Sequence, residues 1–285
     1  MTTTTDLANL SYVSAPLAYL GPTSEPIEHR VYPVSSGRRT ARPPIDYQTM
    51  RIHDARPIAA KLELDVNGFA FHRHSTSFNA FYDDPQVKAD YYAEVSRFVQ
   101  QTLGAVAVIV FDHNTRSAVR AKRGDPGVRM PVDAVHNDYT EFSGPKRSRE
   151  ILTEAKRLDL IGRRYLFVNL WRPIIGPVQD TPLAVCDARS VHPGDIVDTP
   201  IYHYGEDDLE TPRHVGQIQS VRHASGHQWF YLSDMQPEEV LLLKCFDSAT
   251  DGRARFMPHT GFKNPTCPPE FVPRESIEAR TLVVM

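Results

Sequence analysis

The second half of the chain consists of short apolar segments, each about the length of one β-strand, separated by turn residues. Runs of about four to eight residues that are rich in β-branched and aromatic side chains are typical of strands. The segments are 164–171, 183–187, 218–221, 228–232, 239–246, 254–258 and 276–284. A series of many short strands predicts an antiparallel barrel or jelly roll rather than a helical or doubly wound fold.

The first half adds two predicted helices that flank this β-rich part. An apolar stripe predicts a helix over 86–103, and Asp83 or Asp84 can cap it because a carboxylate accepts hydrogen bonds from the free N–H groups of a first turn. A second helix is predicted over 143–160, ended by Gly162. The expected fold is therefore mainly β with flanking helices.

The remaining segments of the first half predict extended structure. Segment 105–111 is a continuous apolar run and predicts a buried strand, whereas 62–71 predicts a hairpin with Asn67-Gly68 as its turn. Residues 1–60 are rich in proline, which interrupts any long helix, so we expect an extended arm packed on a core of residues 61–285. The whole chain, 1–285, is predicted to be a single domain.

Composition excludes several classes of protein. The 32 basic and 35 acidic residues give a net charge of -3, which argues against a general nucleic-acid binder, and no apolar run is long enough to span a membrane. The basic cluster 116–123 is predicted to be a solvated loop, with attraction of an anionic substrate as the alternative. Three cysteines without a CxxC pattern and the absence of a signal peptide predict a cytoplasmic protein with reduced thiols.

The segment His136-Asn137-Asp138 is the first that suggests chemistry. Alternate residues of an extended chain share one face, so His136 and Asp138 can present an imidazole and a carboxylate together. With one distant histidine these groups make a facial triad, which holds Fe(II) and leaves three coordination positions open. Taken alone, however, a His-x-Asp triplet is more often part of a solvated turn.

The last quarter of the chain supplies the missing groups. His259 stands at the end of a predicted strand, and Arg274 and Ser276 open the last one on a shared face. A guanidinium beside a hydroxyl can hold a carboxylate through a bidentate fork. Arg280 lies on the same face and is the rival carboxylate ligand, but Arg274 is favoured because Ser276 accompanies it. The order His-x-Asp, His, Arg-x-Ser is the order that an Fe(II)/2-oxoglutarate oxygenase requires.

Four longer segments, 169–173, 182–188, 231–239 and 258–262, resemble in the same order those of the hydroxylase/desaturase family that includes fungal gibberellin desaturases and the cephamycin 7α-hydroxylase component. The similarity extends over nearly the whole chain. It implies a double-stranded β-helix core (a cupin-like jelly roll) and an oxygenase that needs Fe(II), 2-oxoglutarate and O2. It implies further that a small molecule is hydroxylated, desaturated or cyclised at an unactivated C–H bond, in the biosynthesis of a secondary metabolite such as an antibiotic.

The same resemblance implies roles for individual residues. Carried over by position, His136, Asp138 and His259 are the iron ligands, and Arg274 and Ser276 bind 2-oxoglutarate. The cephamycin relative works with a companion protein, so a companion biosynthetic enzyme is one expected partner beside the small-molecule substrate. No nucleic-acid or membrane partner is expected.

Two further residues near the strand 164–171 have alternative interpretations. Asn169 either lines the pocket beside the iron and its co-substrate or is a satisfied buried amide. Arg172 is predicted to form a structural ion pair with an acidic residue such as Asp187 or Asp234. Two other functions remain open at this point: an iron oxidase that does not use 2-oxoglutarate, and a non-catalytic barrel that binds a small molecule or a partner enzyme.

Overall fold

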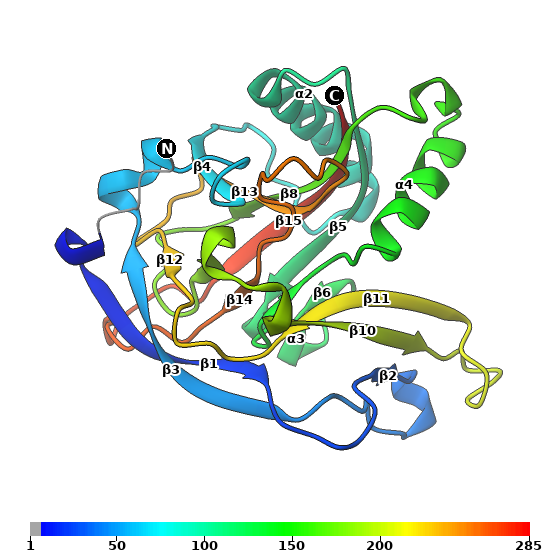
Figure 1. Cartoon of the computed structure of the whole chain (residues 1–285), viewed down its shortest axis with the longest axis horizontal. Coiled ribbons are helices and arrows are strands. Elements are labelled where there is room, and N and C mark those ends of the chain that lie inside the picture. The colour runs from blue at the N-terminus through cyan, green and yellow to red at the C-terminus, as the bar shows by residue number, and fades with distance from the viewer. Residues whose placement is uncertain (1–6) are drawn as a thin grey trace.

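The structure, a computed structural model, describes residues 7–285, which form two β-sheets that face each other (Figure 1). In sheet order, the nine-stranded sheet contains β1 (Tyr12–Leu20), β3 (Ile45–Asp54), β12 (Trp229–Tyr231), β9 (Leu183–Cys186), β14 (His259–Gly261), β7 (His136–Asn137), β11 (His214–Val221), β10 (Ile196–His203) and β2 (His29–Val31). The six-stranded sheet contains β4 (Phe69–Arg73), β13 (Glu239–Asp247), β8 (Tyr165–Pro173), β15 (Glu275–Val284), β5 (Ala107–Ser117) and β6 (Val128–Arg129).

The chain passes repeatedly from one sheet to the other. Strand β8 belongs to the six-stranded sheet, β9 to β12 to the nine-stranded sheet, and β13, β14 and β15 then alternate between the two. Such alternation builds a double-stranded β-helix, in which both sheets contribute side chains to one core. The predicted fold class, mainly β with flanking helices around this core, is confirmed.

Strand β8 shows how the sequence separates two apolar layers. Phe167 and Trp171 point into the space between the sheets, where they pack with residues such as Phe230 of β12. Leu166, Val168 and Leu170 alternate with them and face α2 (Tyr92–Leu103), which covers the outer face of the six-stranded sheet. Because successive side chains of a strand point to opposite faces, a strand buried on both sides is apolar throughout.

The helices are shorter than predicted. The segment 86–103 is helical, but it is built from α1 (Asp84–Gln86), a π-helical turn (Val87–Tyr91) and α2; the predicted cap is confirmed, since the Asp83 carboxylate accepts a hydrogen bond of 3.0 Å from the backbone N–H of Gln86. Helix α4 (Ser143–Glu154) ends before residue 160 because the chain turns at Lys156, whose φ is 55°. The 3-10 helices between residues 7 and 285 are Leu7–Asn9, Val34–Ser36, Arg56–Lys61, Leu158–Leu160, Ala188–Ser190 and Pro193–Asp195.

Three local predictions were wrong. The hairpin over 62–71 does not form, because Asn67 closes a tight turn by accepting a hydrogen bond of 3.0 Å from the Glu63 N–H, and β4 then pairs with β13. The segment 254–258 is not a strand; the next strand is β14. The basic cluster was expected to be a loop, but most of it forms α3 (Ala118–Arg123), capped by the Ser117 hydroxyl.

The amino-terminal part contributes strands to the nine-stranded sheet. Strands β1 and β3 pair in antiparallel fashion over their whole lengths, and β1 is the edge strand of the sheet. Pro16 is tolerated there because an edge strand can lack a backbone donor. The division of the chain into an arm and a core within one domain stays a prediction. Between residues 7 and 285, no helix is long and apolar enough to cross a membrane.

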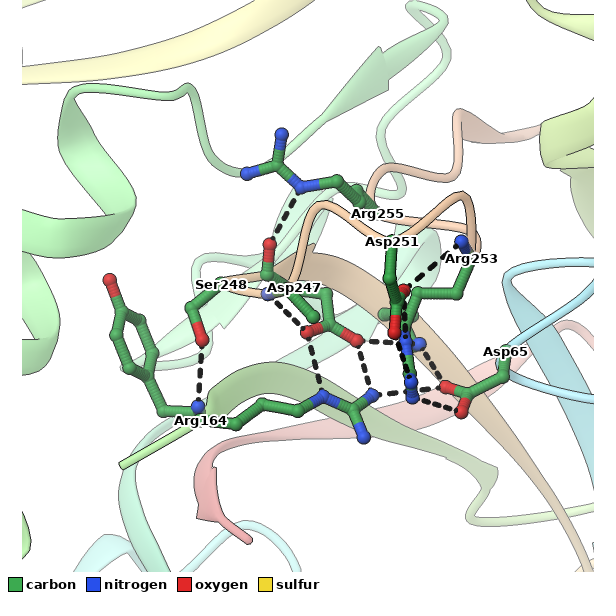
Figure 2. Close-up of polar contacts among 10 residues, drawn as sticks. Asp65, Arg164, Asp247, Ser248, Asp251, Arg253 and Arg255 are labelled. Atoms are coloured by element: carbon green, nitrogen blue, oxygen red, sulfur yellow. Dashed lines mark hydrogen bonds and ion pairs between the residues drawn. The ribbon is translucent and has the colours of Figure 1, made fainter. Parts of the chain in front are cut away.

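A charged network fixes the end of β13 and the loop that leads to β14 (Figure 2). The Asp247 carboxylate forms ion pairs with Arg164 at 2.6 Å and with the fully buried Lys244 at 2.9 Å. Arg253, from the following loop, reaches Asp65 at 2.6 Å. Since this loop leads directly to His259, the network helps to position a residue of the site described next.

Candidate active site

The three predicted iron ligands lie together. His136 of β7 and His259 of β14 are directly opposite each other in neighbouring antiparallel strands, with ring centroids 4.5 Å apart. Asp138 follows β7, and its Oδ1 lies 3.5 Å from Nε2 of His136. One ligand atom from each of the three residues lies within 4.8 Å of the other two. This spacing is suited to a single metal ion.

Backbone carbonyl groups set the orientation of both imidazoles. The carbonyl of Ala134 lies 2.8 Å from Nδ1 of His136, and that of Met257 lies 3.3 Å from Nδ1 of His259. A carbonyl oxygen only accepts, so each Nδ1 carries the proton and each Nε2 keeps its lone pair for a metal. Burial, and secondly the charge of His136, lower the pKa of His259, which favours the neutral form that a ligand needs.

Asp138 is held as a carboxylate. Burial by itself would raise its pKa, but the Arg280 guanidinium and the two histidines hold the pKa of Asp138 well below its usual range. Nη2 of Arg280 lies 3.7 Å from Oδ2 of Asp138, and Nδ2 of Asn169 donates to the same oxygen at 2.7 Å. Asn169 therefore contacts a candidate metal ligand, and its Oδ1 is buried without a partner among the described residues.

A small cavity beside the two histidines contains the buried guanidinium of Arg274. Nε of Arg274 donates to Ser276 Oγ at 3.1 Å, and Nη1 donates to the Thr181 carbonyl at 2.8 Å. No carboxylate of residues 7–285 lies within ion-pair distance of this guanidinium, and burial together with the charge of Arg116 lowers the pKa of Arg274 to about 10. A buried cation is costly without an anionic partner, so the cavity is suited to a carboxylate.

Gly261 leaves the space that such an anion needs. It lines the same cavity, and a Cβ at this position would lie 2.9 Å from the Val132 carbonyl oxygen and 3.3 Å from Nη1 of Arg274. Any side chain here would therefore press against the guanidinium.

Arg280 differs from Arg274 because its charge is already compensated. Its guanidinium lies 3.3 Å from Asp112, 3.4 Å from Glu278 and 3.7 Å from Asp138. Burial works against the charged form, but these carboxylates raise the pKa of Arg280. The geometry therefore favours Arg274 over Arg280 as the residue that receives an external carboxylate.

A second and larger cavity, of about 700 Å³, reaches Asp138 from another side. It is bounded by β5, by α4 and by the hairpin of β10 and β11, which lie on the right of Figure 1. Arg280 and Tyr139 line its inner end beside Asp138. A cavity of this size is within the range of small-molecule binding sites.

Sequence reasoning missed two residues of the site. Glu278 is buried in the small cavity, and the alternation of Arg274, directly before β15, with Ser276 and Arg280 on one face of the strand was the signal that could have identified it. Arg116 lines the same cavity from β5, opposite Ser276. Nothing in the sequence pairs these two strands.

The predicted ion pair of Arg172 was wrong. Asp187 pairs with Arg189 at 2.6 Å, and Asp234 accepts a hydrogen bond from Gln179. Arg172 alternates with Trp171, so it points away from the space between the sheets. There it is fully buried, and its Nη2 donates to the His74 carbonyl at 2.7 Å.

Known proteins are similar to this chain in sequence and in fold. A family model described as "oxidoreductase/YMDC permease-like domain" matches residues 12–284. The Fe(II)/2-oxoglutarate-dependent dioxygenase nvfI of Aspergillus novofumigatus is 31% identical, over 92% of this chain and 91% of the relative. The hydroxylase/desaturase efuI of Hormonema carpetanum is 33% identical, over 83% of each chain. The chain belongs to the Fe(II)/2-oxoglutarate-dependent hydroxylase/desaturase family.

A solved structure supports the same family assignment. The solved structure of the iron and alpha-ketoglutarate-dependent endoperoxidase NvfI matches with a TM-score of 0.83 and 29% identity, covering 96% of this chain and 98% of that one. The predicted family, enzyme class and cofactors are thereby confirmed: the protein is an oxidoreductase that uses Fe(II) and 2-oxoglutarate, and its substrate is a small molecule. An iron oxidase without 2-oxoglutarate and a non-catalytic barrel are set aside.

Proposed function

We propose that His136, Asp138 and His259 hold the single Fe(II) of this hydroxylase/desaturase. The observation that carries the proposal is the convergence of three ligand atoms within 4.8 Å, with the Nε2 lone pairs of both histidines free. Two imidazoles and one carboxylate are the donor set of non-haem Fe(II) oxygenases, and they leave one side of the ion open. When bound there with 2-oxoglutarate, the iron activates O2 for attack on an unactivated C–H bond.

Arg274 and Ser276 hold the far carboxylate of 2-oxoglutarate in this proposal. Support comes from the buried guanidinium without an anionic partner and from the space that Gly261 leaves beside it. A bidentate fork from Arg274 would fix the position of the co-substrate more tightly than a point charge would.

Asn169 and Arg280 act on the cofactor through Asp138 rather than by contact with 2-oxoglutarate. Both contact Oδ2 of Asp138: Nδ2 of Asn169 lies 2.7 Å from this oxygen, and Nη2 of Arg280 lies 3.7 Å from it. Two partners on one oxygen restrict rotation of the carboxylate, so Oδ1 stays directed toward His136. Both residues are positioning residues.

The outcome proposed for the substrate is hydroxylation, desaturation or ring closure in the biosynthesis of a fungal secondary metabolite. Support comes from the relatives, which are named as hydroxylases, desaturases or an endoperoxidase of fungi. A cytoplasmic location is also proposed, because all three cysteines are unpaired. We also propose a companion biosynthetic enzyme as a partner. This part of the proposal rests on the resemblance to the cephamycin component alone, and co-purification can test it.

Anaerobic titration of the purified protein with Fe(II) and 2-oxoglutarate tests the proposal. We expect a weak visible charge-transfer band that saturates at one equivalent of iron, and we expect the band to be lost in His259→Ala. The matched control is His223→Ala, because His223 is exposed and far from β14 in the sequence. A band of unchanged intensity in His259→Ala would contradict the ligand assignment.

A further inference from the structure

The cavity of about 700 Å³ between α4 and the β10–β11 hairpin has Asp138 at its inner end. If Asp138 holds iron as proposed, a molecule in this cavity lies beside a metal ligand. The cavity is therefore where a substrate reaches the reactive centre, and the inference below rests on the proposed function.

Part of the cavity wall is apolar. Phe111 of β5 and Ile218 of β11 line it, and Tyr139 stacks on Phe167 beneath it with ring centroids 4.0 Å apart. Phe142 and Val215 also line the cavity although they are 65% and 40% exposed. Exposed apolar side chains around one cavity indicate a ligand with an apolar body.

Only some of the charged residues that line the cavity form ion pairs with other described residues of the protein. Glu150 binds Arg147 at 3.1 Å, and Asp112 lies 3.3 Å from Arg280. These acidic groups are thus occupied within the protein. Two cations of the wall, Arg129 and Lys146, form no ion pair within the described part of the chain.

Arg129 lies beside another arginine and near two histidines. It pairs with Arg116 across β6 and β5, and it lies close enough to His203 for its charge to lower the pKa of that histidine after the larger effects of burial and of His214. The His203 and His214 rings are 5.8 Å apart and line the same cavity. Two guanidinium groups on neighbouring strands, with no carboxylate of the described residues in ion-pair distance of Arg129, make a site that attracts an anion.

We propose that the substrate is an apolar small molecule that carries one oxyanion group, such as a carboxylate, and that Arg129 receives this group. The apolar body then lies against Phe111 and Ile218, with the anionic end directed away from Asp138. Arg129 is preferred to Lys146 because its fork matches the two oxygens of an oxyanion and because Arg116 adds a second cation beside it.

Two fluorescent probes with the same aromatic body test this proposal. One is 8-anilinonaphthalene-1-sulfonate, which carries an oxyanion, and the other is N-phenyl-1-naphthylamine, which does not. We expect Arg129→Gln to weaken binding of the sulfonate probe by about tenfold or more, because a charge-assisted hydrogen bond is lost, and to leave the uncharged probe unchanged. Arg163→Gln, at an exposed position outside the cavity, is the matched control and should change neither affinity.

A cavity-filling variant locates the probes. Gly216 lines the cavity, and a Cβ there would meet only Nε2 of His214, at 3.8 Å, so the side chain of Gly216→Phe starts from open space in the cavity wall. It should weaken both probes. The proposal would be overturned if Arg129→Gln bound the sulfonate probe as tightly as the unaltered protein does, or if it weakened both probes equally. It would also be overturned if Gly216→Phe left the binding of the probes unchanged, or if Lys146→Gln, rather than Arg129→Gln, produced the selective loss of the sulfonate probe.

The iron and 2-oxoglutarate titration separates this inference from the function on which it rests. Arg129→Gln should keep the charge-transfer band, because Arg129 contacts neither the three ligands nor Arg274. Suppose that the unaltered protein gives no charge-transfer band, but Arg129→Gln still loses affinity for the sulfonate probe selectively. That result would reject the iron assignment and leave the anion site at Arg129 standing.

Discussion

Nδ2 of Asn169 donates a hydrogen bond of 2.7 Å to Oδ2 of Asp138, and this bond joins the middle of β8 to the carboxylate that follows β7. Asn169 belongs to the six-stranded sheet, and Asp138 directly follows a strand of the nine-stranded sheet, so the bond links the two sheets at the candidate metal site. The other carboxylate oxygen of Asp138 is the one near His136. Asn169 thereby orients a candidate metal ligand from the opposite side of the core.

Replacement of Asn169 should weaken iron binding more than folding. We expect Asn169→Ala to lower the Fe(II) affinity by about 10- to 100-fold, since partners of metal ligands have effects of this size. Anaerobic metal titration measures the affinity. Thr281→Val is the control, because it removes a buried hydrogen bond to the Val168 carbonyl without contact to Asp138. Equal iron affinity in Asn169→Ala and the control would exclude the orienting role.

Arg274, directly before β15, and Arg280 within it should respond differently to substitution. Arg274→Lys keeps a charge but loses the fork, so we expect KM for 2-oxoglutarate to rise by about tenfold or more while iron affinity is retained. Arg280→Lys should affect iron affinity first, because Arg280 lies near Asp138. Steady-state kinetics with separate iron titration tells them apart. The reverse pattern would make Arg280 the carboxylate ligand.

Gly261→Ala should impair the co-substrate site by steric contact alone. Its Cβ would lie 2.9 Å from the Val132 carbonyl oxygen and 3.3 Å from Nη1 of Arg274, so the guanidinium must move. We expect a raised KM for 2-oxoglutarate with unchanged iron content. Gly194→Ala, at a position where a Cβ meets nothing within 4 Å, is the control. An unchanged KM in Gly261→Ala would show that the anion binds elsewhere.

The iron-free protein should lose stability as the pH falls, in part through His29. Burial, and then the charges of Arg42 and His136, lower the pKa of His29 from 6.5 to about 4. Below pH 6.5 the unfolded chain takes up a proton that the folded chain does not, so the free energy of unfolding falls as the pH drops from about 6.5 to about 4. Urea unfolding of His29→Gln should show a flatter dependence over this window. His223→Gln, at an exposed position, should follow the unaltered protein, and a His29→Gln curve that did the same would refute the prediction.

Lys244→Met should destabilise the fold although it adds an apolar side chain to a buried position. Lys244 and Asp247 are both fully buried and lie 2.9 Å apart, so the variant leaves Arg164 as the remaining ion-pair partner of the Asp247 carboxylate among the described residues. Removal of one partner of a buried pair costs about 3 kcal/mol of unfolding free energy or more. Urea denaturation measures this change, with Lys122→Met on the exposed side of α3 as control. A loss of less than about 1 kcal/mol would contradict a stabilising role for the network.

Short-range patterns predicted the parts of the fold and site that depend on neighbours in the chain. The cap at Asp83 is one such feature, since capping involves residues three apart, and the shared face of Arg274 and Ser276 is another, since alternation is a local property of strands. Asn67-Gly68 shows the limit of this reasoning. The pair does form a turn, but the partner of the strand that follows is β13, far along the chain.

What the sequence determined by itself was therefore the set of chemical groups: two imidazoles, one carboxylate and an arginine with a serine, each in an extended segment of known periodicity. Only the tertiary structure decided how they combine. The pairing of β7 with β14 places His259 opposite His136, and the carboxylates of Asp112, Asp138 and Glu278 compensate Arg280 but not Arg274. The physical reason is that coordination and charge compensation act through space over a few ångströms, whereas a sequence pattern reports only which residues are close along the chain.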